Sequence, residues 1–176
     1  MPATVLAYIY NGSGPTSGSA EGGITMGRDD NVVSTTVLPI PTSTGTKFSY
    51  AKTLGIQVTG GTLTDHITNR RVLLASSEPA GLHLWWETEA SYSQAVAPAA
   101  ADAGINYAVP GGYSGGSGVG GEVTTTPSLW DNTSVITSVG PNGAYVLIAL
   151  GCDSGFAGGG GSASLPNLLI EYDEGP

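Results

Sequence analysis

The chain has 176 residues and a formal net charge of −9, from 14 acidic and 5 basic side chains. This length suits one domain with its own core and is short for two. The 28 glycines and 11 prolines disfavour long helices, so a helical bundle is excluded. A chain this acidic and poor in basic residues offers no surface for a phosphate backbone, which excludes nucleic-acid binding.

Membrane association is not expected either. No apolar run approaches the roughly 20 residues that a membrane span requires, and residues 1–10 lack the basic start and the cleavage site of a secretory signal. We therefore expect a soluble chain that is not exported by the usual signal and has no membrane partner.

Strand-length segments alternate with turn-forming clusters of Gly, Pro and Asn. In chain order, the predicted strands are Thr4–Tyr10, Ile24–Arg28, Asn31–Leu38, Thr53–Thr59, Arg70–Ser76, Gly81–Glu89, Val119–Thr125, Ala144–Leu150 and Leu168–Tyr172. The second, third, fifth and seventh of these alternate less regularly. The segment around Leu54, Ile56 and Val58 is the clearest, because these apolar residues occupy every second position.

Two later segments differ from a half-buried strand. Gly81–Glu89 alternates Leu and Trp with mixed partners, which indicates a central strand. Ala144–Leu150 is apolar throughout, which favours a strand buried on both faces.

Short strands with turn signals about every ten residues, and no strand–helix alternation, favour two packed antiparallel sheets. We therefore predict an all-β fold, a single-domain antiparallel β-sandwich of jelly-roll-like type spanning residues 1–176. The residues expected in its core are Leu54, Ile56, Val58, Leu82, Leu84, Ile148 and Ile170.

A long Gly/Ala-rich loop interrupts this pattern at about residues 91–121. Its first part is rich in Ala and contains Pro98, and glycine and serine dominate from Pro110 to Gly121. Loops far longer than the usual 4 to 6 residues are normally functional or disordered. This excursion, Ala95–Gly121 above all, is the contact surface that the sequence predicts.

Two motifs resemble catalytic or nucleotide-binding signatures. Ser49–Lys52 matches S-x-x-K, but a serine activated by lysine needs a helix, and this segment runs into a strand. We interpret both residues as surface strand residues. Gly116–Gly121 fits G-x-G-x-x-G, yet neither a strand before it nor a helix after it is predicted, so it is interpreted as loop. The sequence gives no catalytic residue and predicts no enzyme.

Metal ligands are scarce. The chain has two histidines and one cysteine, so a zinc site would need carboxylates; the residues considered are His66, His83, Cys152, Asp65, Glu87 and Asp153. Their spacing matches no known ligand pattern. Asp29-Asp30-Asn31 offers oxygen ligands for calcium, but an Asx-turn is the usual explanation. We expect no metal and no cofactor, and a small buried side chain at Cys152.

The aromatic residues leave two interpretations open. Adjacent Trp85 and Trp86 point to opposite faces of their strand, so both are buried only if the outer face is covered. An exposed aromatic side chain would instead anchor a protein interface or stack on a carbohydrate.

Several segments resemble small structural proteins of tailed bacteriophages and prophages. The segments are Tyr10-Asn11-Gly12, Asp30–Val33, Leu38–Ser43, Phe48–Lys52, Ile67–Arg71 and Ile170–Glu174, and they span most of the chain in outline. They are turn and strand-edge residues without catalytic meaning. The resemblance implies a part of the virion rather than an enzyme, and it does not extend to Ala95–Gly121.

Within the virion, the acidic balance favours the outside of the head, away from packaged DNA. The first hypothesis is a capsid decoration (cement) protein, made in the host cytoplasm, that binds and stabilises the outer surface of the head. Its partners would be the major capsid protein and copies of itself. The alternatives are a tail, neck or fibre component, including a receptor- or glycan-binding module, and a virion-bound hydrolase.

Overall fold

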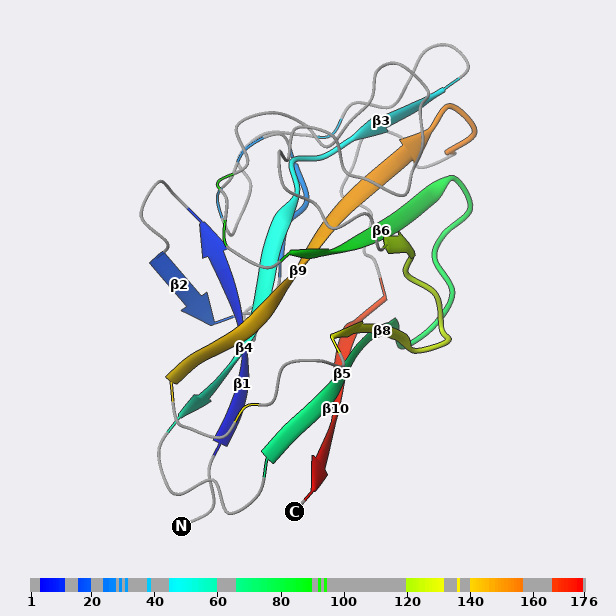
Figure 1. Ribbon diagram of the computed structural model, residues 1–176. Helices are drawn as coiled ribbons and strands as arrows, with labels where there is room; N and C mark the ends of the chain where they lie inside the picture. Colours follow the sequence, from blue (N-terminus) through cyan, green and yellow to red (C-terminus); the bar gives the residue numbers. More distant parts are fainter. Residues whose placement is uncertain are drawn as a thin grey trace.

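The computed structural model of the chain describes residues 4–11, 16–19, 24–27, 29, 31, 38, 45–59, 66–89, 92, 94, 120–131, 136, 140–156 and 166–175. All secondary structure in these ranges is β, and every pair of neighbouring strands is antiparallel. The strands form two sheets (Figure 1). The predicted all-β, antiparallel class is confirmed.

The larger sheet has seven strands in the order β2-β1-β4-β9-β6-β7, and β3 also pairs with β9. Its strands are β1 (Thr4–Asn11), β2 (Thr16–Ser19), β3 (Thr46–Phe48), β4 (Lys52–Thr59), β6 (Leu82–Glu89), β7 (Gly120–Glu122) and β9 (Gly140–Asp153). As predicted, the strand that contains Leu82 is internal, since β6 lies between β9 and β7.

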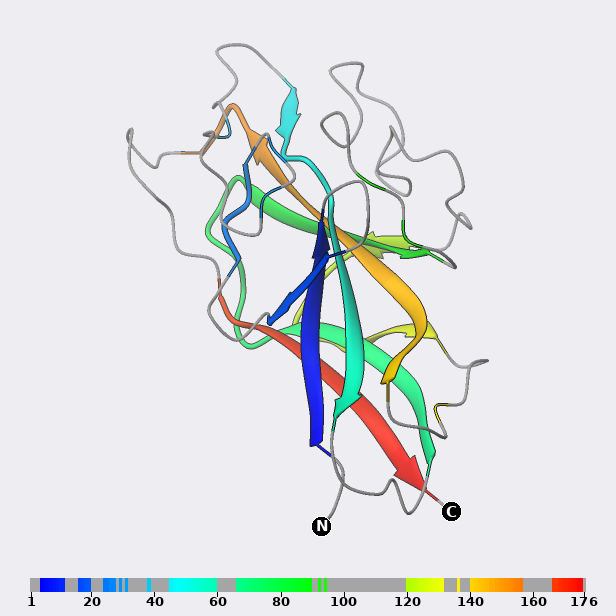
Figure 2. The same cartoon turned by 90° about the vertical axis from the view of Figure 1, so that its left-hand side faces the viewer.

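The smaller sheet has three strands in the order β10-β5-β8. These strands are β5 (His66–Leu74), β8 (Ser128–Asp131) and β10 (Leu168–Gly175). Figure 2 shows them crossing behind the lower half of β1 and β4, at an angle to those strands. The start of β1 and the end of β10 lie at the same end of the molecule in both views.

The main hydrophobic core lies between the two sheets. Leu54, Ile56 and Val58 of β4 belong to the same buried cluster as Val72 and Leu74 of β5. Six of the seven predicted core residues are buried, namely Leu54, Ile56, Val58, Leu82, Leu84 and Ile148. The seventh, Ile170, is half-buried and packs against the cluster. Two antiparallel sheets around a shared core are consistent with a β-sandwich.

The opposite face of the larger sheet is buried along the middle of β9 as well. Val146, Ile148 and Leu150 of β9 belong to the main core, while the intervening Leu147 and Ala149 are also buried. Burial of both faces, predicted from the unbroken apolar run, is confirmed.

The tryptophans follow the same alternation. Trp86 lies in the main core, and Trp85 packs against a second cluster of Phe48, Ala51 and Ala149 on the opposite face. We call the face of the larger sheet that bears Trp85 its outer face.

Several strand predictions were wrong in extent. Strand β5 begins at His66, four residues before the predicted start at Arg70. Its alternation is broken at Asn69, which has a positive φ of 47°, and register shifts occur where β10 and β8 pair with it. Strands β2, β3 and β8 were not predicted, because strands of three or four residues are too short to show a period.

Other predictions fall partly or wholly on undescribed residues. In the predicted strand Ile24–Arg28, the described residues include one bridge residue, Thr25, and no named strand. Most of Asn31–Leu38 lies outside the described residues, as does most of the 91–121 excursion. The last two residues of that excursion, Gly120 and Gly121, belong to β7. The loop therefore ends before them.

Candidate functional site

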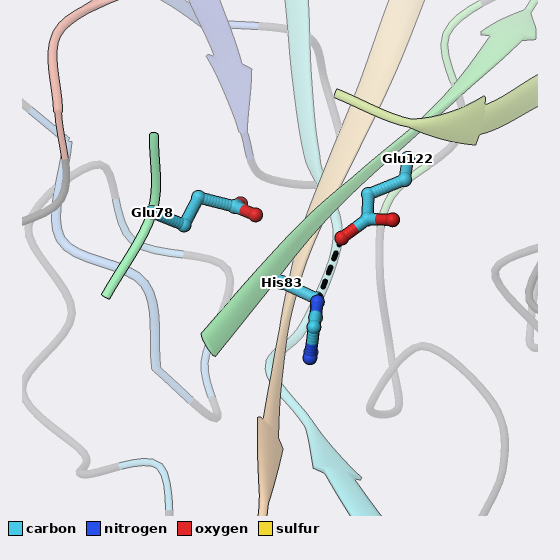
Figure 3. A group of neighbouring side chains, drawn as sticks. All are labelled: Glu78, His83 and Glu122. Carbon is cyan, nitrogen blue, oxygen red and sulfur yellow. Dashed lines mark hydrogen bonds and ion pairs between the residues drawn. The ribbon is translucent and has the colours of Figure 1, made fainter. Parts of the chain in front are cut away.

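A polar cluster surrounds His83 on the outer face of β6. The Nδ1 atom of His83 lies 2.7 Å from Oε1 of Glu122, and its Nε2 atom lies 3.2 Å from Oδ2 of Asp153. Glu78 approaches from the turn before β6, with its carboxylate directed toward that strand (Figure 3). One imidazole is thus placed among three carboxylates.

Strand register explains how Glu122 and Asp153 reach His83. Glu122 of β7 lies opposite Trp85, and Cys152 of β9 lies opposite Leu82. Since side chains alternate between faces, Glu122 and Asp153 project on the same face as His83, each diagonal to it on a neighbouring strand.

Glu78 is held by the edge of β6. Its Oε1 atom accepts a hydrogen bond from the backbone N–H of Leu84. The backbone oxygen of Leu84 accepts a hydrogen bond from Val123, at 2.7 Å, where β7 begins to cover this edge. Glu78 therefore accepts the hydrogen bond from the Leu84 N–H that a backbone carbonyl of a neighbouring strand would otherwise accept.

The carboxylates determine the ionisation of this cluster. Burial alone would lower the pKa of His83, but the hydrogen bond to Glu122 and the charges of Glu122, Asp153 and Glu78 outweigh it and raise that pKa. Burial raises the pKa of Glu78, and the charge of Glu122 adds to this, against the opposing hydrogen bond from Leu84. The cluster therefore favours holding a positive charge.

Chemically, such a cluster can bind a cation or exchange a proton with solvent. The side chains of His83 and Asp153 are 35% and 38% exposed. One ligand atom from each of Glu78, His83 and Glu122 lies within 4.8 Å of the others. These three residues are the candidate ligand set.

The cluster contains only part of the zinc set considered from the sequence. His83 and Asp153 come together, whereas Glu87 lies four residues further along β6, about 13 Å away at ~3.3 Å per residue. His66 is in β5 of the other sheet, and Asp65 lies outside the described residues. Glu78 and Glu122 were missed because a turn and the pairing of β7 with β6 bring them to His83.

The predicted surface position of Ser49 and Lys52 was wrong, because both side chains are buried. Ser49 Oγ donates to the carbonyl of Tyr50 at 2.9 Å and accepts from the N–H of Leu150 at 3.0 Å. Lys52 lies in strand β4, and its ammonium bonds two backbone carbonyl oxygens, that of Asp29 at 2.6 Å and that of Asn31. Both side chains thus bond to the backbone of neighbouring segments.

The Asx-turn expected at residues 29–31 is confirmed. The backbone N–H of Asn31 donates to Oδ1 of Asp29 at 3.0 Å, while Asp30 lies outside the described residues. Cys152 is a free, buried cysteine as expected, and burial together with the charge of Asp153 raises its pKa. Of the Gly116–Gly121 motif, the described residues are the two glycines of β7.

A second surface feature lies on the smaller sheet. Leu129 of β8, Leu169 of β10 and Tyr172 of β10 are 42%, 41% and 36% exposed, and they are the large exposed hydrophobic residues of the described chain. Leu169 lies opposite Leu73, and Leu129 lies opposite Arg71. Both leucines therefore project from the face of this sheet that points away from the core.

An ion pair lies on this face, since Arg71 is the residue opposite Leu129. Arg71 donates from one guanidinium nitrogen to both carboxylate oxygens of Asp173, at 2.8 and 2.7 Å, and Asn69 donates to Oδ2 at 2.7 Å. These hydrogen bonds lower the pKa of Asp173. They cross-link β5 and β10 beside the register shift between Glu171 and Asp173.

Comparisons with protein-family models, curated proteins and solved structures find no match to this chain. Among the described residues, no helix has the length and apolar character needed to cross a membrane.

Proposed function

We propose that this chain is a bacteriophage virion structural protein, a capsid decoration protein that binds and stabilises the outer surface of the head. The observation that carries the proposal is that the large exposed hydrophobic side chains among the described residues, Leu129, Leu169 and Tyr172, all belong to the smaller sheet. The resemblance of several segments to phage structural proteins supplies the type of particle.

Four of the six segments that carry the resemblance meet in pairs. Ile67–Arg71 and Ile170–Glu174 lie side by side in β5 and β10, joined through Asp173. The carbonyl of Asn31 accepts a hydrogen bond from Lys52, which joins two further segments. These contacts stabilise the fold, and segments with this role support a structural function for the chain.

The exposed face of the smaller sheet suits a partner with an apolar surface. Leu129 and Leu169 project from the side of this sheet opposite the core. With five basic residues in the whole chain, a network of ion pairs is a weak source of binding energy, since an exposed pair contributes about 0 to 1 kcal/mol. We therefore propose that this face contacts the major capsid protein, and that binding depends little on salt.

Purified chain added to heads that lack it tests this contact. Wild-type chain should load onto the heads, and the double variant Leu129→Ser/Leu169→Ser should load at reduced occupancy. Glu174→Gln, an exposed change on β10, is the matched control and should load like the wild type. If the double variant loads as well as the wild type, this face is not part of the interface. If the wild-type chain does not bind heads, the proposed function is contradicted.

The 91–121 excursion remains the second candidate contact. A deletion designed to test it should stop at Val119, because Gly120 and Gly121 pair with Glu87 and Trp86 of β6. Deleting Gly111–Val119 should leave the protein folded and weaken its binding to heads. Unchanged binding would leave the smaller sheet as the sole proposed contact. The jelly-roll connectivity and the association with copies of itself stay predictions.

A further inference from the structure

We propose that Glu78, His83 and Glu122 form a binding site for one divalent transition-metal ion of the zinc type. This inference departs from the metal-free protein expected from the sequence, and it is independent of the capsid contact proposed above. The three residues come from the turn before β6, from β6 itself and from β7. Figure 3 shows the imidazole beside the carboxylate of Glu122, and the carboxylate of Glu78 directed toward β6 from the other side of its ribbon in this view.

The contacts of the imidazole support this inference. A neutral imidazole has one N–H donor and one acceptor nitrogen. Both nitrogens of His83 face carboxylate oxygens, those of Glu122 and Asp153. The imidazolium form would donate to both carboxylates, whereas in the neutral form one nitrogen lone pair would point at a carboxylate oxygen. A metal ion between Nδ1 and Glu122 would replace that repulsion with two bonds.

Asp153 has the position of a supporting residue. A histidine that binds a metal almost always donates its other ring N–H to a carboxylate or carbonyl, which fixes the tautomer and the ring orientation. With Nδ1 on the metal, Nε2 would carry the hydrogen and donate it to Asp153, 3.2 Å away. Asp153 in turn accepts a hydrogen bond from the hydroxyl of Thr46 on β3. Asp153 is thus a positioning residue rather than a ligand.

Glu78 also retains a free oxygen for the metal. The N–H of Leu84 binds its Oε1 atom, which anchors the carboxylate and leaves Oε2 for coordination. Zinc bonds to nitrogen and oxygen of about 2.0–2.2 Å place tetrahedral ligand atoms about 3.4 Å apart. The present atoms lie within 4.8 Å of one another, so small side-chain rotations would close the site.

The type of ligand selects the metal. One imidazole nitrogen and two carboxylate oxygens suit Zn²⁺ and neighbouring transition metals, whereas Ca²⁺ takes six to eight oxygen ligands and Mg²⁺ requires an octahedral oxygen shell. Three protein ligands leave a fourth tetrahedral position for water.

Titration calorimetry with ZnCl₂ tests the site, using the full chain purified without a polyhistidine tag. One Zn²⁺ should bind per chain, and neither CaCl₂ nor MgCl₂ should compete at the same concentration. His83→Gln and Glu122→Gln should each weaken binding by at least about tenfold, and Asp153→Asn by about 10- to 100-fold. His66→Gln, which changes the one other histidine, is the control and should bind like the wild type.

Imidazole ¹⁵N spectra of the wild-type chain give a readout that needs no variant to fold. Zn²⁺ should shift the Nδ1 resonance of His83 and leave both nitrogens of His66 unchanged. The proposal is overturned if the wild type shows no site of unit stoichiometry, if His83→Gln binds Zn²⁺ like the wild type, or if the resonances of His66 shift instead.

Discussion

Truncation of Leu84 to alanine tests the two-sheet core. Leu84 is 3% exposed, lies opposite Leu150 in the pairing of β6 with β9, and belongs to the cluster shared by both sheets. Replacing it with alanine removes three carbon groups, each contributing about 0.8 kcal/mol when buried, and leaves a cavity that adds to this loss. We expect Leu84→Ala to lower the free energy of unfolding by about 3 to 4 kcal/mol.

The matched control is Leu129→Ala on the exposed face of the smaller sheet. Leu129 is 42% exposed, so the same truncation forfeits about half of the burial and encloses no cavity. We expect a loss of at most about 1.5 kcal/mol. Urea unfolding followed by tryptophan fluorescence measures both variants. At a slope of about 2 kcal/mol per molar urea, Leu84→Ala should lower the midpoint by about 1.5 M or more.

Two results would refute this reasoning. A loss below about 1 kcal/mol for Leu84→Ala would mean that the side chain is not enclosed between the sheets. Equal losses for Leu84→Ala and Leu129→Ala would mean that the described exposure does not distinguish core from surface. A far-UV circular dichroism spectrum dominated by helix would contradict the all-β fold itself.

Two further predictions concern a glycine and a pH-dependent contact. Gly81→Ala should destabilise the protein by about 1 to 3 kcal/mol, because Gly81 has a φ of +83° and an added Cβ would lie 2.8 Å from the backbone N of Phe156. Gly155→Ala meets open space and should change stability by less than about 0.5 kcal/mol; equal urea midpoints for the two variants would contradict this. Hydrogen bonds from Arg71 and a neighbouring asparagine lower the pKa of Asp173 below its ordinary value of 3.8, so its carboxylate stabilises the fold above pH 3.8 and loses that contribution as pH falls through the lowered pKa. Asp173→Asn should therefore lower the urea midpoint at pH 7, and the difference from the wild type should shrink as the pH falls through the lowered pKa; a wild-type midpoint at pH 7 would count against the ion pair.

The regular parts of the fold could be predicted from the sequence. Alternation around Leu54, Ile56 and Val58 correctly predicts β4, and the unbroken apolar run correctly predicts that β9 is buried on both faces. Strand β5 was misplaced because Asn69 adopts a positive φ and interrupts the period. The burial of Lys52 could not be predicted, since it depends on carbonyl groups about twenty residues earlier in the chain.

The candidate site was predictable only in part. The alternation of β6 places His83 away from the main core, and Asp153 was among the residues considered as its partners. Their contact depends on the register between β6 and β9, which the sequence does not specify. Glu78 and Glu122 carry no local signal, because one belongs to a turn and the other to a strand of three residues.

Locating the protein on the assembled particle tests the proposed function most directly. A cryo-EM reconstruction of the virion, combined with quantitative mass spectrometry of purified particles, gives both position and copy number. A decoration protein should occur in hundreds of copies on the outer surface of the head, with the exposed face of β10 and β8 against the major capsid protein. A few to dozens of copies in the tail, neck or fibres, or purified particles without the protein, would contradict the account.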